Sequence, residues 1–301
     1  MALEIINRKI VGTIDNLEEK LEGKLPVTRE ELLVLVNSWG RLGNFYAKAS
    51  NNQILMIDKC DSKECYDLSK LDTSEITDMS SIFRNSEFNG DISNWNTSNV
   101  TSMLGMFNNA RTFNQELNFD TSNVTNMEWM FSYAEKFNQE LKFDTSNVTD
   151  MSGMFYRAEN FNQRLNFYTS NVTNMRTMFS YAREFNQPLN WDTSNVTNME
   201  WMFSYARSFN QAINFDTSNV TAIDYMFCET SAFKDKYNNG EPLSTNTNDI
   251  KEWLNNNREK MNELDIKENH GKEIDDFFSN ILLTECKKIE NEKNLDLKKN
   301  L

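Results

Sequence analysis

The sequence holds few of the residues that enzymes and metal proteins use. Its 301 residues include one histidine, His270, and four cysteines. It has no Ser-His-Asp arrangement, no glycine-rich phosphate loop and no set of ligands at metal-binding spacing. Cys60 and Cys65 are close enough to be bridged within a loop, but free thiols in a reducing compartment fit the sequence better. We therefore expect no enzyme activity, no metal and no cofactor.

Long apolar runs and an excess of positive charge are also missing. No stretch approaches the roughly 18 apolar residues of a membrane-spanning helix, so we expect no membrane span. The start of the chain carries charges throughout and resembles no secretory signal, which predicts a cytoplasmic protein unless export uses another route. The 45 acidic residues outnumber the 31 basic ones and give a net charge of −14. This charge disfavours nucleic acid and anionic membrane surfaces as partners.

What the sequence does have is a repeat of 24 residues. It is seen in seven phenylalanines, each following Met or Ile: Phe83, Phe107, Phe131, Phe155, Phe179, Phe203 and Phe227. A Thr-Ser pair recurs with the same period, from Thr73 to Thr217. A fixed period in this range is the signature of stacked repeats, in which each unit contacts only its neighbours.

Each repeat contains eight residues with the spacing of one helix face. We call these eight residues the Met segment; the seven copies begin at Met79, Met103, Met127, Met151, Met175, Met199 and Ile223. The first, fourth and fifth residues are apolar in every copy, and the eighth is alanine in all but the first and last copies. This spacing predicts a short helix that persists only by packing on the next unit. Ahead of it, 117–119 and 124–127 are expected to be short strands joined by a polar turn at 120–123.

Two polar features of the repeat are expected to be structural. One asparagine recurs beside a buried phenylalanine, and we predict a stacked amide ladder bonded to backbone groups at Asn114, Asn138, Asn162, Asn186 and Asn210. The recurring aspartates are expected to make side-chain-to-backbone turns. Most of the 15 methionines fall at core positions, so core filling is favoured over a plastic binding groove.

The units follow the pattern FNQxLNFDTSNVTNMxxMFxxA over residues 66–233. In this pattern they resemble the BspA-like leucine-rich repeat surface proteins, a repeat type abundant in mycoplasmas. The resemblance implies a right-handed solenoid, usually at a cell surface and used in adhesion or protein binding. Together with the spacing, it predicts an α/β solenoid: a leucine-rich-repeat-like right-handed coil of short parallel strands and short helices, with helical N- and C-terminal caps.

The predicted domains are an N-terminal capping region at 1–65, seven repeats at 66–233 and a C-terminal helical cap at 234–301. In the first region, helices are expected within 5–21 and after a capping box that begins at Thr28, and a strand is expected at 54–57. Amphipathic helices are expected at 249–264 and 272–289. These last two helices could instead dock on another chain or form a dimerisation hairpin.

The third and seventh residues of the Met segment should face solvent if the segment is helical. They include the partner-binding candidates Trp129, Tyr133, Arg157, Tyr181, Trp201, Tyr205 and Tyr225. Exposed Trp, Tyr and Arg dominate interface energies, which predicts a protein-binding stripe and aromatic pairs within a segment. The alternative is that neighbouring aromatic side chains cover each other across units.

From these patterns we predict a non-catalytic repeat scaffold for protein–protein recognition through its variable exposed face, with a protein partner of unknown identity. The alternatives are a surface adhesin or carbohydrate-binding protein and, more remotely, a carboxylate-dependent glycan-active enzyme. The missing signal peptide favours the cytoplasm, whereas the family resemblance favours the cell surface or secretion. The sequence leaves the oligomeric state open.

Overall fold

The structure is a computed structural model that describes residues 12–39, 45–48, 54–57 and 67–269. The chain divides into two compact units, Met1–Trp253 and Leu254–Leu301. The predictions for Cys60, Cys65, Cys286, His270 and the helix at 272–289 lie outside the described residues, as does the boundary at 65. The domain boundaries therefore stay predictions.

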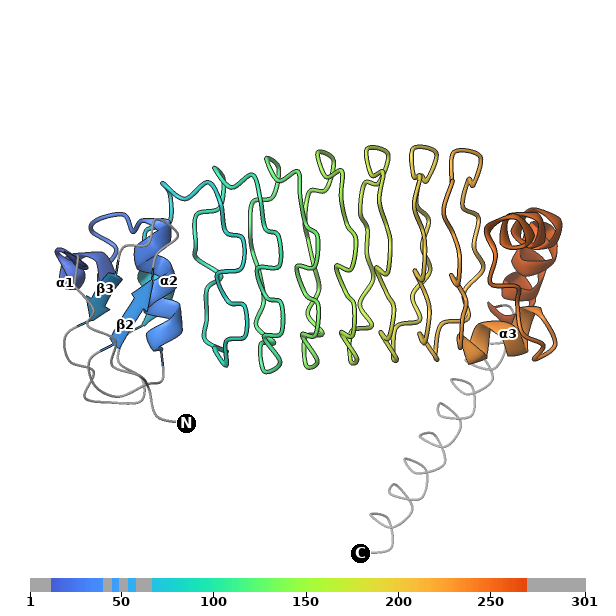
Figure 1. The fold of residues 1–301 in the computed structure, drawn as a ribbon, viewed down its shortest axis with the longest axis horizontal. Coiled ribbons are helices and arrows are strands. Elements are labelled where there is room, and N and C mark those ends of the chain that lie inside the picture. Colours follow the sequence, from blue (N-terminus) through green and yellow to red (C-terminus); the bar gives the residue numbers. More distant parts are fainter. Residues whose placement is uncertain (1–11, 40–44, 49–53, 58–66, 270–301) are drawn as a thin grey trace, which may run out of the picture. The chain divides into compact units, whose positions relative to one another are not determined.

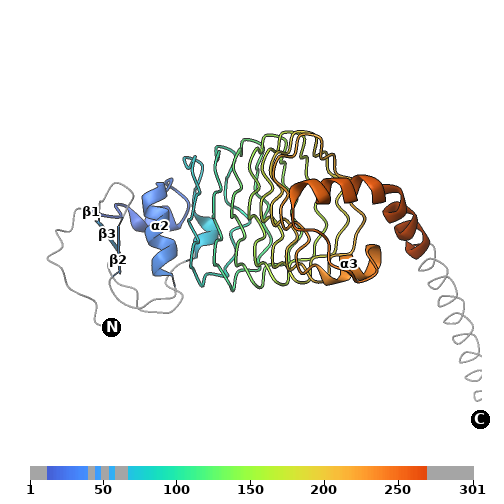
Figure 2. The same cartoon turned by 45° about the vertical axis from the view of Figure 1, so that its right-hand side comes forward.

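The repeats form a stack of coils in the first unit. Figures 1 and 2 show these coils side by side, each one repeat long. Isolated parallel bridges join residues one repeat apart, for example Ser102 with Asn126 and Asn126 with Asp150. Each coil therefore contacts mainly the coil before it and the coil after it, as the repeat period predicts.

The predicted class of fold is wrong. Between the 3-10 helix η1 (Leu68–Lys70) and the helix α3 (Ser231–Tyr237), the described coils contain neither an α-helix nor a strand, only isolated bridges. An α/β solenoid of short parallel strands and short helices, built like a leucine-rich repeat, does not describe them. The expected strands at 117–119 and 124–127 are reduced to single bridges at Leu117 and Asn126.

The Met segment is a pair of four-residue turns instead of a helix. In the third copy, the Met130 N–H donates to the Met127 carbonyl at 3.2 Å, and the Ala134 N–H donates to the Phe131 carbonyl at 3.0 Å. The third residue of each turn has a positive φ, which turns of this kind require. A four-residue period brings the first, fourth, fifth and eighth residues to the interior, and over so short a segment a helix with 3.6 residues per turn does the same. The spacing of the apolar residues could therefore not distinguish turns from a helix.

The backbone of the Met segment is hydrogen-bonded to the next coil. In the first six copies, the N–H groups of the first, third, fifth and seventh residues donate to carbonyl oxygens of the following coil. For the segment that begins at Met127, these four N···O distances lie between 2.7 and 3.1 Å. The polar backbone groups that a helix would pair internally are therefore paired between coils.

The interior of the stack is a set of aromatic columns. The seven repeated phenylalanines are all buried, as predicted. Their successive ring centroids lie 5.1 to 6.1 Å apart with nearly parallel planes. A second column, from Phe113 to Phe233, runs beside the first, and Phe131 lies 4.2 Å from Phe137 within one coil. Together with the buried methionines, these columns form the core.

The predicted asparagine ladder is confirmed. The Asn162 Oδ1 atom accepts the backbone N–H of Asn186 at 2.9 Å and the Gln187 Nε2 group at 3.0 Å. The same pair of bonds joins Asn186 to the next coil. The aspartate turns are confirmed as well, since the Asp120 carboxylate accepts the Ser122 N–H at 3.0 Å. Side-chain hydrogen bonds therefore stabilise both the segment that carries the asparagine ladder and the turn that begins at the aspartate.

In the described part of the chain before the coils, three strands and two α-helices occur. The described elements are β1 (Gly12–Thr13), α1 (Leu17–Leu21), α2 (Arg29–Ser38), β2 (Phe45–Lys48) and β3 (Ile54–Ile57). The sheet has the order β1-β3-β2, with β3 parallel to β1 and antiparallel to β2. The strand at 54–57 and the Thr28 capping box of α2 are confirmed. A continuous helix over 5–21 is wrong, because within its described part, 12–21, residues 12–13 form a strand and 17–21 form a helix.

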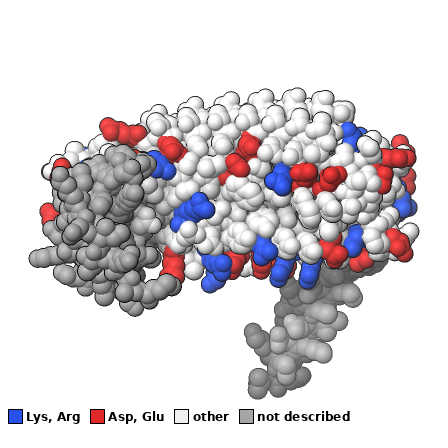
Figure 3. Space-filling model, in the orientation of Figure 1, with Lys and Arg blue, Asp and Glu red and all other residues white. Residues whose placement is uncertain are grey.

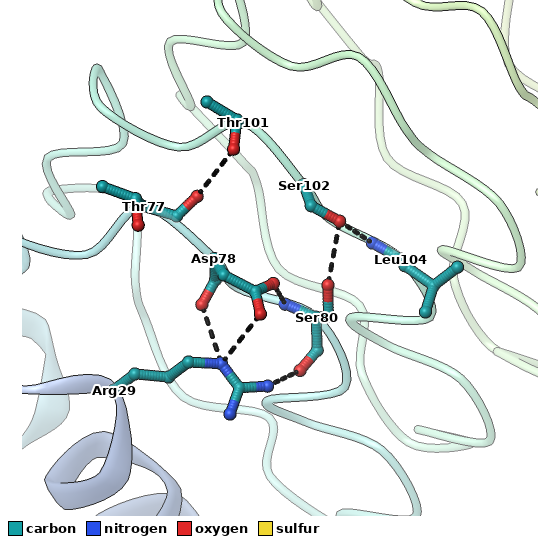
Figure 4. A network of polar contacts seen from close by, with 7 residues as sticks. All are labelled: Arg29, Thr77, Asp78, Ser80, Thr101, Ser102 and Leu104. Carbon is teal, nitrogen blue, oxygen red and sulfur yellow. Dashed lines mark hydrogen bonds and ion pairs between the residues drawn. The ribbon is translucent and has the colours of Figure 1, made fainter. Parts of the chain in front are cut away.

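Helix α2 is bonded to the first coil through Arg29. Its guanidinium donates to the Asp78 carbonyl at 3.0 Å and to the Ser80 carbonyl at 2.6 Å, and it lies 3.3 Å from the Asp78 carboxylate (Figure 4). Carbonyl oxygens of the later coils accept N–H groups from the coil before them. The first coil has no preceding coil, so Arg29 of α2 donates to its carbonyl oxygens instead.

The last coil is followed by α3 and by a helix over 247–269, which contains the predicted helix 249–264. Phe233 of α3 continues the second aromatic column, 6.1 Å from Phe209. The N–H groups of Ile223 and Tyr225 donate to Thr247 and Thr245, which take the place of a further coil. Among the described residues, no helix is long and apolar enough to cross a membrane.

Candidate binding face

The seven partner-binding candidates all have a left-handed backbone. We call the side chains of the third and seventh residues of the seven Met segments the outer face. The φ angles of the candidates lie between 55° and 61°: Trp129 55°, Tyr133 57°, Arg157 57°, Tyr181 61°, Trp201 58°, Tyr205 60° and Tyr225 59°. The structure therefore brings them together in two columns, although the predicted helix is absent.

This conformation is costly for large side chains. A residue with a Cβ in the left-handed region loses about 1 kcal/mol or more, and glycine or asparagine is the usual occupant. Glycine does occupy the third position in two segments, at Gly105 and Gly153, and asparagine occupies the seventh at Asn85 and Asn109. The later coils carry Trp, Tyr and Arg at a backbone position that does not favour them.

The rings of the outer face pair between coils. Tyr181 stacks on Tyr205 with centroids 4.4 Å apart, and Trp201 stacks on Tyr225 at 4.2 Å. The Trp129 indole lies over Gly153, where an added Cβ would come within 2.3 Å of the ring. This is the mutual covering that the alternative interpretation expects. The aromatic pairing predicted within a segment rested on a helix and fails with it.

Arg157 lies in the middle of the seventh-residue column. Its guanidinium carbon is 4.4 Å from the Tyr181 ring centroid and 5.4 Å from that of Tyr133, both within cation–π range. The Arg157 Nε group also donates to the Tyr156 hydroxyl at 3.4 Å. This hydrogen bond raises the pKa of Arg157, and burial together with Tyr156 raises the pKa of the Tyr133 hydroxyl. The column therefore carries a fixed positive charge between aromatic rings.

The outer face is half-buried rather than fully exposed. Six of the seven candidates have intermediate exposure, and Tyr225 is 40% exposed. The structure thus leaves part of each of these side chains accessible. Whether a partner binds these accessible parts stays a prediction.

An open pocket of about 370 Å³ lies at the start of the outer face. Its lining includes Ser81 and Gly105 at third positions, Trp129 and Tyr133 from the following coil, and Ser132. The sequence analysis did not single out Ser132 or the other sixth residues of the Met segments. In the expected helix, the sixth position belonged neither to the apolar set nor to the solvent-facing pair. The signal that could have found the pocket was Gly105, a glycine inside an otherwise helical pattern.

Charged side chains are dispersed over the coils. Acidic and basic residues are interspersed on the face shown in Figure 3. Some pair between successive coils, such as Arg176 with Glu200 at 3.2 Å and Arg111 with Glu135 at 3.4 Å. These exposed pairs contribute little stability. In the part of the chain that the structure describes, no three His, Cys, Asp or Glu side chains could share a metal ion.

Comparison with known proteins identifies the family. One family model, described as Mycoplasma protein of unknown function, DUF285, matches residues 52–168, 141–240 and 165–274. The three overlapping matches span the coils and their flanks, more than half of the chain. No curated protein and no solved structure matches. The chain belongs to the DUF285 family, whose function is unknown.

Proposed function

We propose that this chain is a non-catalytic binding protein that recognises another protein through the outer face. The observation that carries the proposal is the set of Trp, Tyr and Arg side chains held in left-handed backbone. Strained residues of this kind cluster where function requires them. Trp, Tyr and Arg are also the residues that contribute most to binding energy at interfaces.

Stacking between coils offsets part of this strain. An aromatic pair adds about 0.5–1.5 kcal/mol beyond area burial, which is of the same size as the cost of one left-handed residue. Because each stack joins two such residues, stacking alone does not offset the strain of both. A rigid column of rings also loses little conformational entropy when a partner covers it, which favours binding.

The test uses variants that remove rings without adding strain. Asparagine tolerates the left-handed region and occupies the seventh position in the first two segments. In the double variant Tyr181→Asn, Tyr205→Asn, we expect the affinity for a protein partner to fall about tenfold or more, the effect of a lost hot spot. The partner would first be captured with the immobilised full chain, then purified and titrated by biolayer interferometry.

The matched control is Tyr168→Ala, which removes a 67% exposed tyrosine that lies outside the Met segments. Unchanged affinity in the double variant would contradict the proposal, as would an equal loss in the control. The resemblance to BspA-like surface proteins extends the proposal to a place of action, the cell surface. Fractionation of intact cells with an antibody against the full chain tests that extension.

A further inference from the structure

The open pocket at the start of the outer face exists because small residues precede a tryptophan. At the third position, the first two segments carry Ser81 and Gly105, and the third carries Trp129. A Cβ added at Gly105 would meet only ordinary contacts, the nearest at 3.5 Å. In contrast, the Trp129 ring fills the space above Gly153. The indole therefore covers Gly153 and also lines the pocket.

The pocket lining includes several polar side chains. Ser132 is only 1% exposed, and its Oγ atom makes no hydrogen bond. The same unpaired hydroxyl recurs at Ser204, the sixth residue of a later Met segment, so it is a property of the coil and does not by itself indicate a ligand. Arg84, which is exposed, and Asn108, which is half-buried, line the pocket and are accessible to a ligand.

The lining points to one class of ligand. It offers an aromatic wall, hydroxyl and amide groups that donate and accept, and one guanidinium, without any Asp or Glu. A phosphate would need more cations or backbone donors than a single arginine supplies. An acidic peptide side chain would use Arg84 but leave the indole wall uncovered. A sugar ring uses all of them, because its C–H face packs on indole and its hydroxyls pair with polar groups.

We infer that this pocket binds a single sugar residue that carries a carboxylate, a hexuronic acid, with the ring against Trp129 and the carboxylate on Arg84. The volume lies within the range of small-ligand sites. The inference concerns the first three coils, whereas the proposed protein contact is tested on later ones. If the sugar site fails its test, the proposed protein contact is unaffected, and the reverse also holds.

The experiment titrates glucuronate, glucose and N-acetylglutamate into the full chain and follows binding by NMR. We expect saturable binding with glucuronate tightest. Arg84→Gln should weaken glucuronate about tenfold, the size of one charge-assisted hydrogen bond, and leave glucose unchanged. Gly105→Asn keeps the left-handed backbone and fills the pocket, so it should abolish binding of both sugars.

The control is Tyr168→Ala, which removes an exposed ring outside the Met segments and should bind as the unaltered chain does. Three results would overturn the inference. They are no binding of either sugar, unchanged binding in a folded Gly105→Asn variant, and N-acetylglutamate binding as tightly as glucuronate. The last would indicate a site for acidic peptide side chains.

Discussion

The interior and the outer face of the coils are built from the same eight residues and differ in what they tolerate. Inside, every Met segment places Met or Ile first and Phe fifth, fully buried and stacked on its neighbours. Outside, the third and seventh residues range from Gly and Ser to Trp, Tyr and Arg on an unchanging left-handed backbone. The backbone is fixed by hydrogen bonds between coils and by the core. The outer side chains are therefore free to differ, even at some cost in strain.

The largest expected effect is a cavity in the interior. Phe155 is fully buried in the middle of its column, with its ring 4.1 Å from Phe161. Phe155→Ala should destabilise the chain by about 3–5 kcal/mol, because both transfer energy and packing are lost. Urea unfolding followed by circular dichroism measures this. Tyr168→Ala, which removes an exposed ring, should change stability by less than about 0.5 kcal/mol. Equal losses of stability in the two variants would contradict the difference described here between interior and surface positions.

The next effect concerns the asparagine ladder. Asn162→Ala removes the acceptor for the Asn186 N–H and the Gln187 amide. We expect a loss of about 1–3 kcal/mol, because these donors become unsatisfied. The matched control is Asn166→Ala, an exposed asparagine of the same coil. If both substitutions cost the same in urea unfolding, the ladder contributes no more than a surface asparagine.

A smaller effect tests the left-handed backbone directly. Tyr205→Gly and Tyr205→Ala both lose the stack on Tyr181, but only alanine keeps the strain at φ 60°. The glycine variant should therefore be more stable than the alanine variant by about 1 kcal/mol. Next to it, Ala206→Gly should destabilise the chain, since that position lacks a positive φ. If glycine is also worse than alanine at Tyr205, the strain assigned to the outer face is wrong. Thermal unfolding of the four proteins measures these differences.

The smallest effect is on pH dependence at the polar turns. Hydrogen bonds from the Ser122 hydroxyl and N–H lower the pKa of Asp120, and the same groups of Ser146 lower that of Asp144. A carboxyl with a lower pKa in the folded state adds stability above its unfolded pKa of about 3.9. That stability is lost as the pH falls through the folded pKa.

The double variant Asp120→Asn, Asp144→Asn keeps the oxygen acceptor and removes the titration. We expect it to lose less stability than the unaltered chain between neutral pH and about pH 3, as measured by urea midpoints. The reverse order would show that these carboxylates do not favour the folded state. Because both turns are exposed, the effect should be modest.

The sequence by itself determined the period, the buried positions and the polar ladder. Phe131, Met127 and Asn138 were placed correctly because burial and amide bonding follow from spacing, whatever the backbone between them. The helix predicted from the same spacing was wrong. Four apolar positions out of eight fit both one helix face and two four-residue turns.

Only the tertiary structure decided between them. A helix would pair its own backbone groups, whereas the stacked coils pair the N–H groups of residues such as Trp129 and Tyr133 with the next coil. That pairing depends on a neighbour one repeat away, which no local pattern describes. It also forces the left-handed backbone of the outer face and leaves the pocket in front of Trp129. The physical reason is that cooperation between coils, rather than local propensity, selects the conformation of each Met segment.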